Sequence, residues 1–235
     1  TPVEVGTGDV TSLFSAERDR ELSLILQNMT PENAAASRQL LGSVLSVNEP
    51  LHEGRYWIRL FRMTAFVLER ELEAAHREAG ILLRPPSTAP SVRSAPAVWP
   101  GELARLLLGG GVDTDLVLVL EGDPGWYPAL DDFYRGLRRL LDGDLQGAAR
   151  ALERYAQSER KSVGDPEWPY ALQNLSKELH RRVMAWISLS EEVERLLAQD
   201  QVAEVKARLE PVQSRLFVPF KAPFEERIRE IEARQ

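Results

Sequence analysis

Residues 127–155 read as two amphipathic helices separated by a short turn, and this pattern constrains the fold more than any other part of the sequence. Apolar side chains recur at three- and four-residue spacing on both sides of Gly143-Asp144, a pair suited to reversing the chain. One helical hairpin cannot bury both of its apolar faces, so it needs neighbours of the same kind. The sequence therefore predicts an all-α fold of stacked helical hairpins.

This segment resembles a tetratricopeptide repeat, a helix-turn-helix unit of about 34 residues that stacks on copies of itself. The positions that agree are the small residue of the first helix, the turn, and two packing positions of the second helix: Gly136, Gly143-Asp144, Ala148 and Leu152. The sequence departs from the motif at Arg135, Arg139, Tyr155 and Pro166. The resemblance is thus to a degenerate repeat.

Two other segments repeat parts of this hairpin. Leu103–Gly109 matches Leu137–Gly143 at an offset of 34 residues, and Leu196–Val202 repeats the same helix end and turn. The resemblance implies an adaptor or scaffold that binds another protein or a peptide on a concave surface. Because the first helix of each hairpin commonly lines that surface, we predict partner contacts at Tyr127, Tyr134, Arg138 and Arg139.

Composition divides the chain into four parts. We predict a flexible tail at 1–10, an additional N-terminal helical region at 11–83, a linker at 84–100 and the repeat-like region at 101–235. The linker contains five prolines and few large apolar residues, so we expect it to be extended.

Within these parts, three local patterns predict helices. Thr30-Pro31-Glu32 predicts a helix start capped by Thr30, and apolar spacing predicts one uninterrupted helix over 54–79. A further helix is predicted over 202–216, kinked at Pro211. Residues 115–121 alternate like a strand, but no second strand is evident, so we favour a helix and keep an edge strand as the alternative.

Several classes of function are disfavoured. The formal net charge of −7 argues against general binding of nucleic acid, which needs clustered basic residues. The absence of cysteine excludes disulfides, thiolate catalysis and Cys-based zinc sites, and the three histidines lack metal-ligand spacing, so we expect no metal and no cofactor. No segment is apolar enough to span a membrane.

The sequence does not fix the cellular compartment of the protein, and we favour the cytoplasm. The sequence begins at Thr1 without a visible secretory signal, so we expect a removed leader or further chain upstream. Arginine greatly outnumbers lysine, which we interpret as bacterial-like genomic composition rather than as a sign of function. Arg55, Arg59 and Arg62 share one helix face, and we expect them to pair with acidic neighbours while their stems cover apolar surface.

Two alternatives to an adaptor stay open. Arg70 and His76 resemble the Arg-x4–6-His element of the nucleic-acid-cleaving helical family known as higher eukaryote and prokaryote nucleotide-binding domains, which would imply a nuclease. A structural subunit could instead form a homo-oligomer through exposed apolar side chains such as Phe217, Phe220 and Phe224. Of the three, we expect a non-enzymatic protein-binding role.

Overall fold

The computed structural model describes residues 16–46, 52–83, 95–109, 128–158 and 170–234. Within these ranges the chain forms ten helices and no strand, which confirms the predicted all-α fold. The helices are α1 (Ala16–Gln27), α2 (Ala34–Ser46), α3 (His52–Leu68), α4 (Leu72–Leu82), α5 (Ala95–Leu108), α7 (Pro128–Asp142), α8 (Leu145–Ala156), α9 (Gln173–Leu197), α10 (Val202–Leu209) and α11 (Val218–Glu232).

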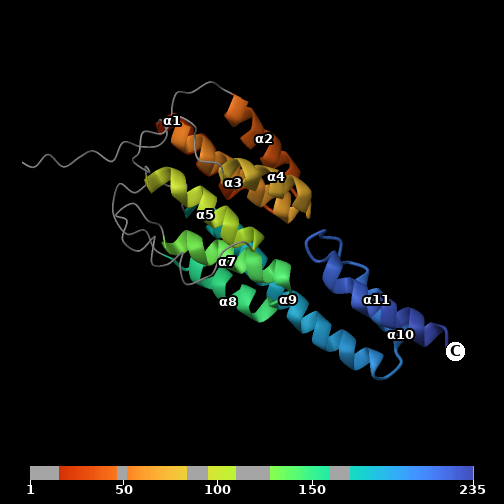
Figure 1. The fold of residues 1–235 in the computed structure, drawn as a ribbon. Coiled ribbons are helices and arrows are strands. Elements are labelled where there is room, and N and C mark those ends of the chain that lie inside the picture. The colour runs from red at the N-terminus through yellow and green to blue at the C-terminus, as the bar shows by residue number, and fades with distance from the viewer. Residues whose placement is uncertain (1–15, 47–51, 84–94, 110–127, 159–169, 235) are drawn as a thin grey trace, which may run out of the picture.

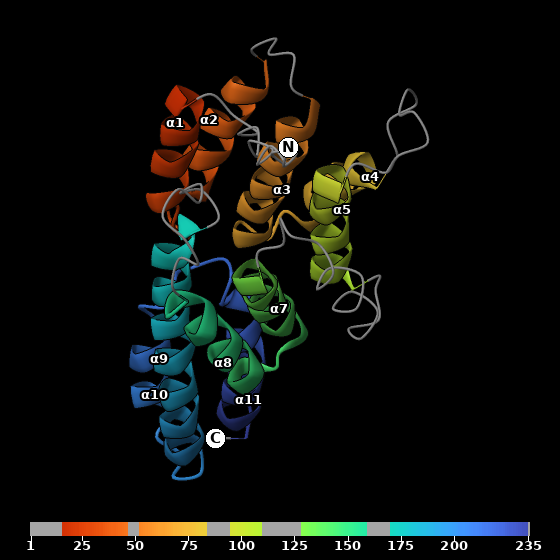
Figure 2. The same ribbon diagram turned by 90° about the vertical axis from the view of Figure 1, so that its left-hand side faces the viewer.

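Helices that follow one another in the sequence mostly pack against one another (Figure 1). This holds for α2 and α3, α3 and α4, α7 and α8, and α8 and α9, while α5 joins α3 to α7. The C-terminal half of α9 extends past α8 and carries α10 and α11 as an arm. Figure 2 shows α1 at the end of α9, and the two helices are in contact, so early and late parts of the chain meet.

One continuous apolar core runs from the N-terminal helices into the α7–α8 hairpin. Its largest fully buried side chains include Trp57 and Phe61 of α3 and Phe133 and Tyr134 of α7. The Tyr134 hydroxyl lies 3.1 Å from Oγ1 of Thr64, and both side chains are buried. Helices on either side of the predicted linker therefore share one core.

Three helix-to-helix turns have the same backbone geometry. Each contains a residue with positive φ, namely Arg70 (60°), Gly143 (85°) and Asp200 (55°). In each, the next N–H donates to a carbonyl five residues earlier: Glu71 to Phe66, Asp144 to Arg139 and Gln201 to Leu196. This is the Schellman arrangement, which ends a helix and reverses the chain. The turn predicted at Gly143-Asp144 is confirmed, and Asp144 caps α8 by accepting from the N–H of Gly147 at 2.9 Å.

The helix predicted over 54–79 is in fact two helices. α3 ends at Leu68 and α4 begins at Leu72, because the left-handed conformation of Arg70 breaks the chain of helical hydrogen bonds. A non-glycine residue rarely adopts this conformation, and the segment contains neither proline nor glycine there, so the break left no signal in the sequence.

Two proline-containing segments also differ from expectation. α5 begins at Ala95, so 95–100 is helical rather than extended, with Pro96 in the first turn and Pro100 in the interior. The helix predicted over 202–216 is not merely kinked: α10 ends at Leu209, and residues 210–217 connect it to α11. Pro211 lacks the N–H that would continue α10. The predicted tail at 1–10, the rest of the linker at 84–94, residues 115–121 and Tyr127 lie outside the described residues.

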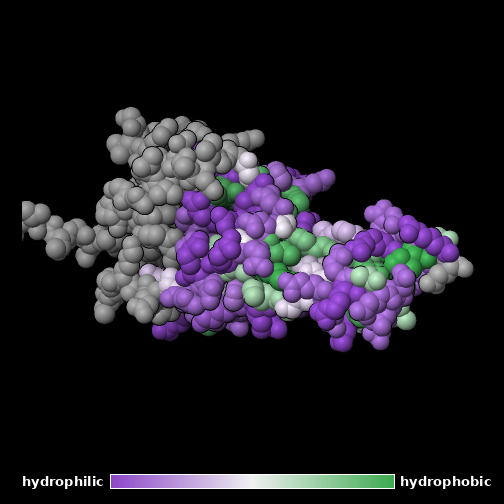
Figure 3. Space-filling model, turned by 90° about the horizontal axis from the view of Figure 1, so that it is seen from below, coloured by the Kyte–Doolittle hydropathy of each residue, from purple (hydrophilic) through white to green (hydrophobic). Residues whose placement is uncertain are grey.

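Apolar surface is local rather than continuous on the face shown in Figure 3, where apolar residues gather in the middle of the molecule and on the arm of α9, α10 and α11. Among the described helices, none is long and apolar enough to cross a bilayer.

Candidate functional site

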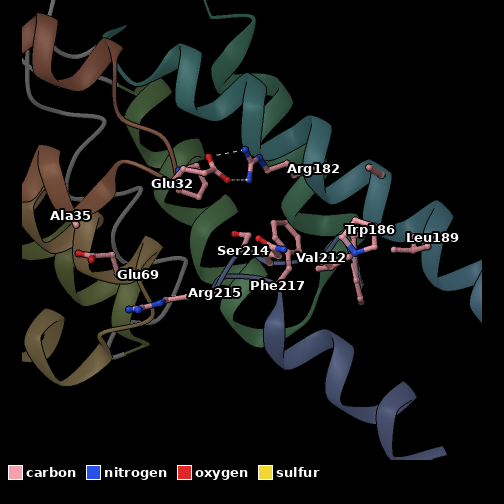
Figure 4. Close-up of a pocket in the computed structure, with 14 residues that line it drawn as sticks. Glu32, Ala35, Glu69, Arg182, Trp186, Leu189, Val212, Ser214, Arg215 and Phe217 are labelled. Carbon is pink, nitrogen blue, oxygen red and sulfur yellow. Dashed lines mark hydrogen bonds and ion pairs between the residues drawn. The ribbon is translucent and has the colours of Figure 1, made fainter. Parts of the chain in front are cut away.

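A cleft of about 680 Å³ lies where three parts of the chain meet, and we call it the α2–α9 cleft (Figure 4). The first wall is the start of α2 together with Glu69 at the end of α3, the second is the middle of α9, and the third is the connection between α10 and α11. Such a junction of distant segments is where binding sites commonly form in helical proteins.

The start of α2 is held by reciprocal capping. Asn33 N–H donates to Oγ1 of Thr30 at 3.3 Å, and Thr30 N–H donates to Oδ1 of Asn33 at 2.6 Å. This confirms the predicted cap at Thr30, with Asn33 in the place that Glu or Gln takes in the usual capping box. The two bonds fix Pro31 and Glu32 at the edge of the cleft.

Glu32 is bound to Arg182 of α9, 150 residues later in the chain. Both terminal nitrogens of the Arg182 guanidinium donate to the Glu32 carboxylate, and Nη2 lies 2.8 Å from Oε2. The Nε of Arg182 donates to Glu178 at 2.6 Å. Burial acts to raise the pKa of Glu32, but the hydrogen bond and charge of Arg182 outweigh it and hold this pKa below its usual range. The hydrogen bond from Arg181, opposed by burial and reinforced by Arg182, lowers the pKa of Glu178 to about 2.

The floor of the cleft is apolar and aromatic. Trp186 and Phe217 are each only 4% exposed, and their ring centroids lie 6.3 Å apart. Phe220 and Phe224 of α11 complete the cluster around Trp186. Phe217 and Phe224 are buried and Phe220 is half-buried, so two of the three side chains named for the self-association alternative lie inside the molecule.

The third wall presents three consecutive polar side chains, Gln213, Ser214 and Arg215. Their backbone follows the end of α10, and Ser214 contributes its carbonyl to the N–H of Phe217 at 2.9 Å. With respect to the described residues, none of the three side chains makes a hydrogen bond or ion pair. They are thus available to a ligand.

Arg70 supports this wall through a hydrogen bond to its backbone. Its Nη2 donates to the backbone carbonyl of Leu216 at 3.4 Å, which ties the α3–α4 turn to the α10–α11 connection. Burial lowers the pKa of Arg70. His76 is exposed on α4, with Nδ1 2.7 Å from the carbonyl of Leu72. No hydrogen bond or ion pair between described residues joins Arg70 to His76.

The four predicted partner-binding residues have different surroundings. Tyr127 lies outside the described residues. Tyr134 is fully buried, and this burial raises the pKa of its hydroxyl despite the contact with Thr64. A side chain with no exposed surface cannot contact a partner, so Tyr134, at 0% exposure, belongs to the core face of α7. Arg138 pairs with Asp142 at 2.7 Å, and Arg139 lies 4.0 Å from Asp144.

Two of the three arginines predicted to pair on α3 contact an acidic neighbour. Arg59 and Arg62 contact opposite oxygens of the buried carboxylate of Glu78 at 3.0 and 3.3 Å. The guanidinium of Arg62 also lies 5.7 Å from the ring centre of Phe66. Arg55 donates to the carbonyl of Leu45 at 3.0 Å. Arg59 and Arg62 thus pair with an acidic neighbour as predicted, whereas Arg55 binds a backbone carbonyl instead.

Within the part of the chain that the structure describes, no three His, Asp or Glu side chains are grouped as metal ligands would be. Comparison with protein-family models gave no match, and comparisons with curated proteins and with solved structures found no similar chain. The α2–α9 cleft is therefore interpreted from its own chemistry.

Proposed function

We propose that this protein is a non-enzymatic adaptor whose helical scaffold binds a segment of another protein in the α2–α9 cleft. The observation that carries the proposal is the chemistry of the cleft: an aromatic floor of Trp186 and Phe217 beside hydrogen-bonding groups at Gln213, Ser214 and Arg215. An apolar floor with a few polar groups at its edge is the usual composition of a ligand-binding site.

The scaffold that we propose is a degenerate, tetratricopeptide-like stack. Three hairpins, α3–α4, α7–α8 and α9–α10, support it by sharing one turn geometry. Gly109 ends α5 with a φ of 84°, close to the 85° of Gly143, in agreement with the 34-residue offset between their sequences. The succession of contacts from α3 to α5 and from α5 to α7 also resembles the way first helices of such repeats pack in series.

The test uses Ala185, an exposed residue of α9 that lines the cleft. Replacing Ala185 by Arg fills the cleft entrance without touching the buried core. The matched control is Ala36→Arg, at an exposed position of α2 that does not line the cleft. Both variants add one identical charged side chain to an exposed helix position.

The protein and both variants are used to capture partners from cells of the source, and bound proteins are compared by quantitative mass spectrometry. We expect at least one protein to be retained by the unchanged chain and by Ala36→Arg and to be lost with Ala185→Arg. Retention of the same proteins by all three would show that the cleft is not the binding site. If the partner is instead lost when Arg138 and Arg139 are replaced by Ala, its binding site is on α7.

A further inference from the structure

We infer that Arg70 is a positioning residue, which holds the third wall of the α2–α9 cleft in place while it destabilises its own turn. This inference rests on the proposed function, because it concerns how the proposed binding site keeps its shape. It combines the left-handed backbone of Arg70, the surroundings of its guanidinium and the weak internal support of the wall.

The backbone conformation of Arg70 is unfavourable for a residue with a side chain. Its φ is 60°, and an L residue is strained in this left-handed region. The α7–α8 hairpin has the same turn geometry and places Gly143 at the equivalent position, where φ is 85°. Glycine adopts this conformation without strain. The turn between α3 and α4 would therefore form more readily with glycine than with arginine at residue 70.

The guanidinium of Arg70 is poorly compensated for its burial. Its Nε is buried without a hydrogen-bond partner among the described residues, and burial lowers its pKa. No described carboxylate forms an ion pair with it, although Glu69 and Glu71 are its neighbours in the sequence. Both of these carboxylates lie near Arg38 instead, at 2.8 and 4.0 Å. A charge taken out of water in this way destabilises the folded state.

The hydrogen bond that this guanidinium does make is to the third wall. Nη2 donates to the backbone carbonyl of Leu216 at 3.4 Å, and Leu216 is fully buried. Glycine at residue 70 would remove both the backbone strain and the buried charge, and it would lose this bond. What arginine contributes at this position is therefore the connection between the α3–α4 turn and the wall.

The wall needs such a connection because it has little support of its own. Over residues 211–216, only the N–H of Val212 donates to a described backbone carbonyl. The chain is held again from Phe217, whose ring packs on Trp186. In Figure 4 the side chain of Arg215 points towards Glu69, so the stretch before Phe217 faces the end of α3, where Arg70 follows.

Spin labels can measure the position of the wall, because the chain has no cysteine and introduced ones are labelled selectively. Gln213→Cys places a nitroxide on the wall, and Gln39→Cys places another on the exposed face of α2. Double electron–electron resonance on the full chain gives the distribution of distances between the labels. We expect a narrow distribution with Arg70 and a broader one with Arg70→Met, which keeps a long stem and loses the donor. Arg70→Lys keeps a charged donor and should restore the narrow distribution.

Partner capture and urea unfolding distinguish positioning from general stability. Arg70→Met and Arg70→Gly should each reduce the affinity for the captured protein about fivefold, as expected if the wall is in place about a fifth of the time. Arg70→Lys should bind as the unchanged chain does. Arg70→Gly should nevertheless not lower the midpoint of urea unfolding, since it removes the backbone strain and the buried charge. Circular dichroism of each variant verifies that it is folded.

Three results would overturn the inference. The first is an unchanged distance distribution in Arg70→Met. The second is equal capture by Arg70→Met and the unchanged chain while Ala185→Arg captures nothing, which would leave the proposed function standing. The third is a lower urea midpoint in Arg70→Gly together with its loss of capture, which would make Arg70 a residue of the general fold. If the unchanged chain captures no protein, the proposed function fails, and the spin labels still decide whether Arg70 holds the wall.

Discussion

Gly136 lies where α7 and α8 come closest, since a Cβ atom at this position would be 2.7 Å from Cγ of Leu152 and 3.2 Å from its backbone nitrogen. Gly136→Ala should therefore destabilise the protein by about 1–3 kcal/mol through overpacking. Urea unfolding followed by circular dichroism measures the change. The matched control is Gly42→Ala in α2, where a Cβ would meet nothing within 4 Å and stability should rise by about 0.5–1 kcal/mol. Equal effects at both glycines would contradict the close approach.

Glu178 makes stability depend on pH in the acid range. Its pKa is lowered in the folded protein to about 2, from an ordinary value of 4.5, chiefly by the hydrogen bond from Arg181. A depressed carboxyl pKa stabilises the fold above the unfolded value, and this contribution is lost as pH falls from about 4.5 through about 2. Glu178→Gln should flatten the pH dependence of the unfolding free energy in that window. An unchanged slope would show that the interaction does not contribute to stability.

At the scale of the elements, the three Schellman turns carry different residues at the same left-handed position. Gly143→Ala should cost about 1 kcal/mol, because an L side chain is strained at a φ of 85°. Asp200→Gly should have the opposite effect and raise the free energy of unfolding by about 0.5 kcal/mol, because it relieves backbone strain at a φ of 55°. Thermal and urea unfolding of the two variants test the pair. Destabilisation by both would mean that Asp200 contributes an interaction beyond its backbone conformation.

These turns show which elements could be predicted from sequence. The glycine of Gly143-Asp144 predicts a turn, and the hydroxyl of Thr30 with the proline that follows it predicts a helix cap. Both predictions are confirmed. Arg70 carries no such signal: its left-handed conformation occurs at a residue that rarely adopts it, so the sequence pattern predicts a single helix where the structure has α3 and α4. At the linker, prolines suggested extension, although proline is compatible with the first turn of α5.

The candidate site was not predictable for a related reason. Tyr134 was assigned to a surface by its position in the hairpin, but burial depends on neighbours that α3 supplies from 70 residues away. The walls of the α2–α9 cleft come from segments far apart in the chain, and no local pattern pairs Glu32 with Arg182, 150 residues later. In the sequence, Glu32 is part of a helix start and Arg182 is an arginine in the middle of a helix, and neither feature predicts a contact between them.

At the scale of the whole molecule, the bond between Glu32 and Arg182 joins the N-terminal helices to α9. A double-mutant cycle of Glu32→Gln and Arg182→Gln should give a coupling energy of about 0.5–1 kcal/mol, as expected for a partly exposed pair. Hydrogen exchange followed by mass spectrometry should also show faster exchange in 16–46 for Glu32→Gln. Zero coupling together with unchanged exchange would contradict a structural role for this bond.

The position of Phe217 late in the chain has a consequence for biosynthesis. Ribosomes make the N-terminal helices first, and local hairpins such as α7–α8 can form as they emerge. The third wall of the cleft, however, is translated only after α9 and α10. A chain that ends before residue 211 lacks this wall, although it contains the start of α2 and the whole of α9. Under the proposed function, a chain without this wall should not bind the partner, so only chains translated past residue 217 should recruit it.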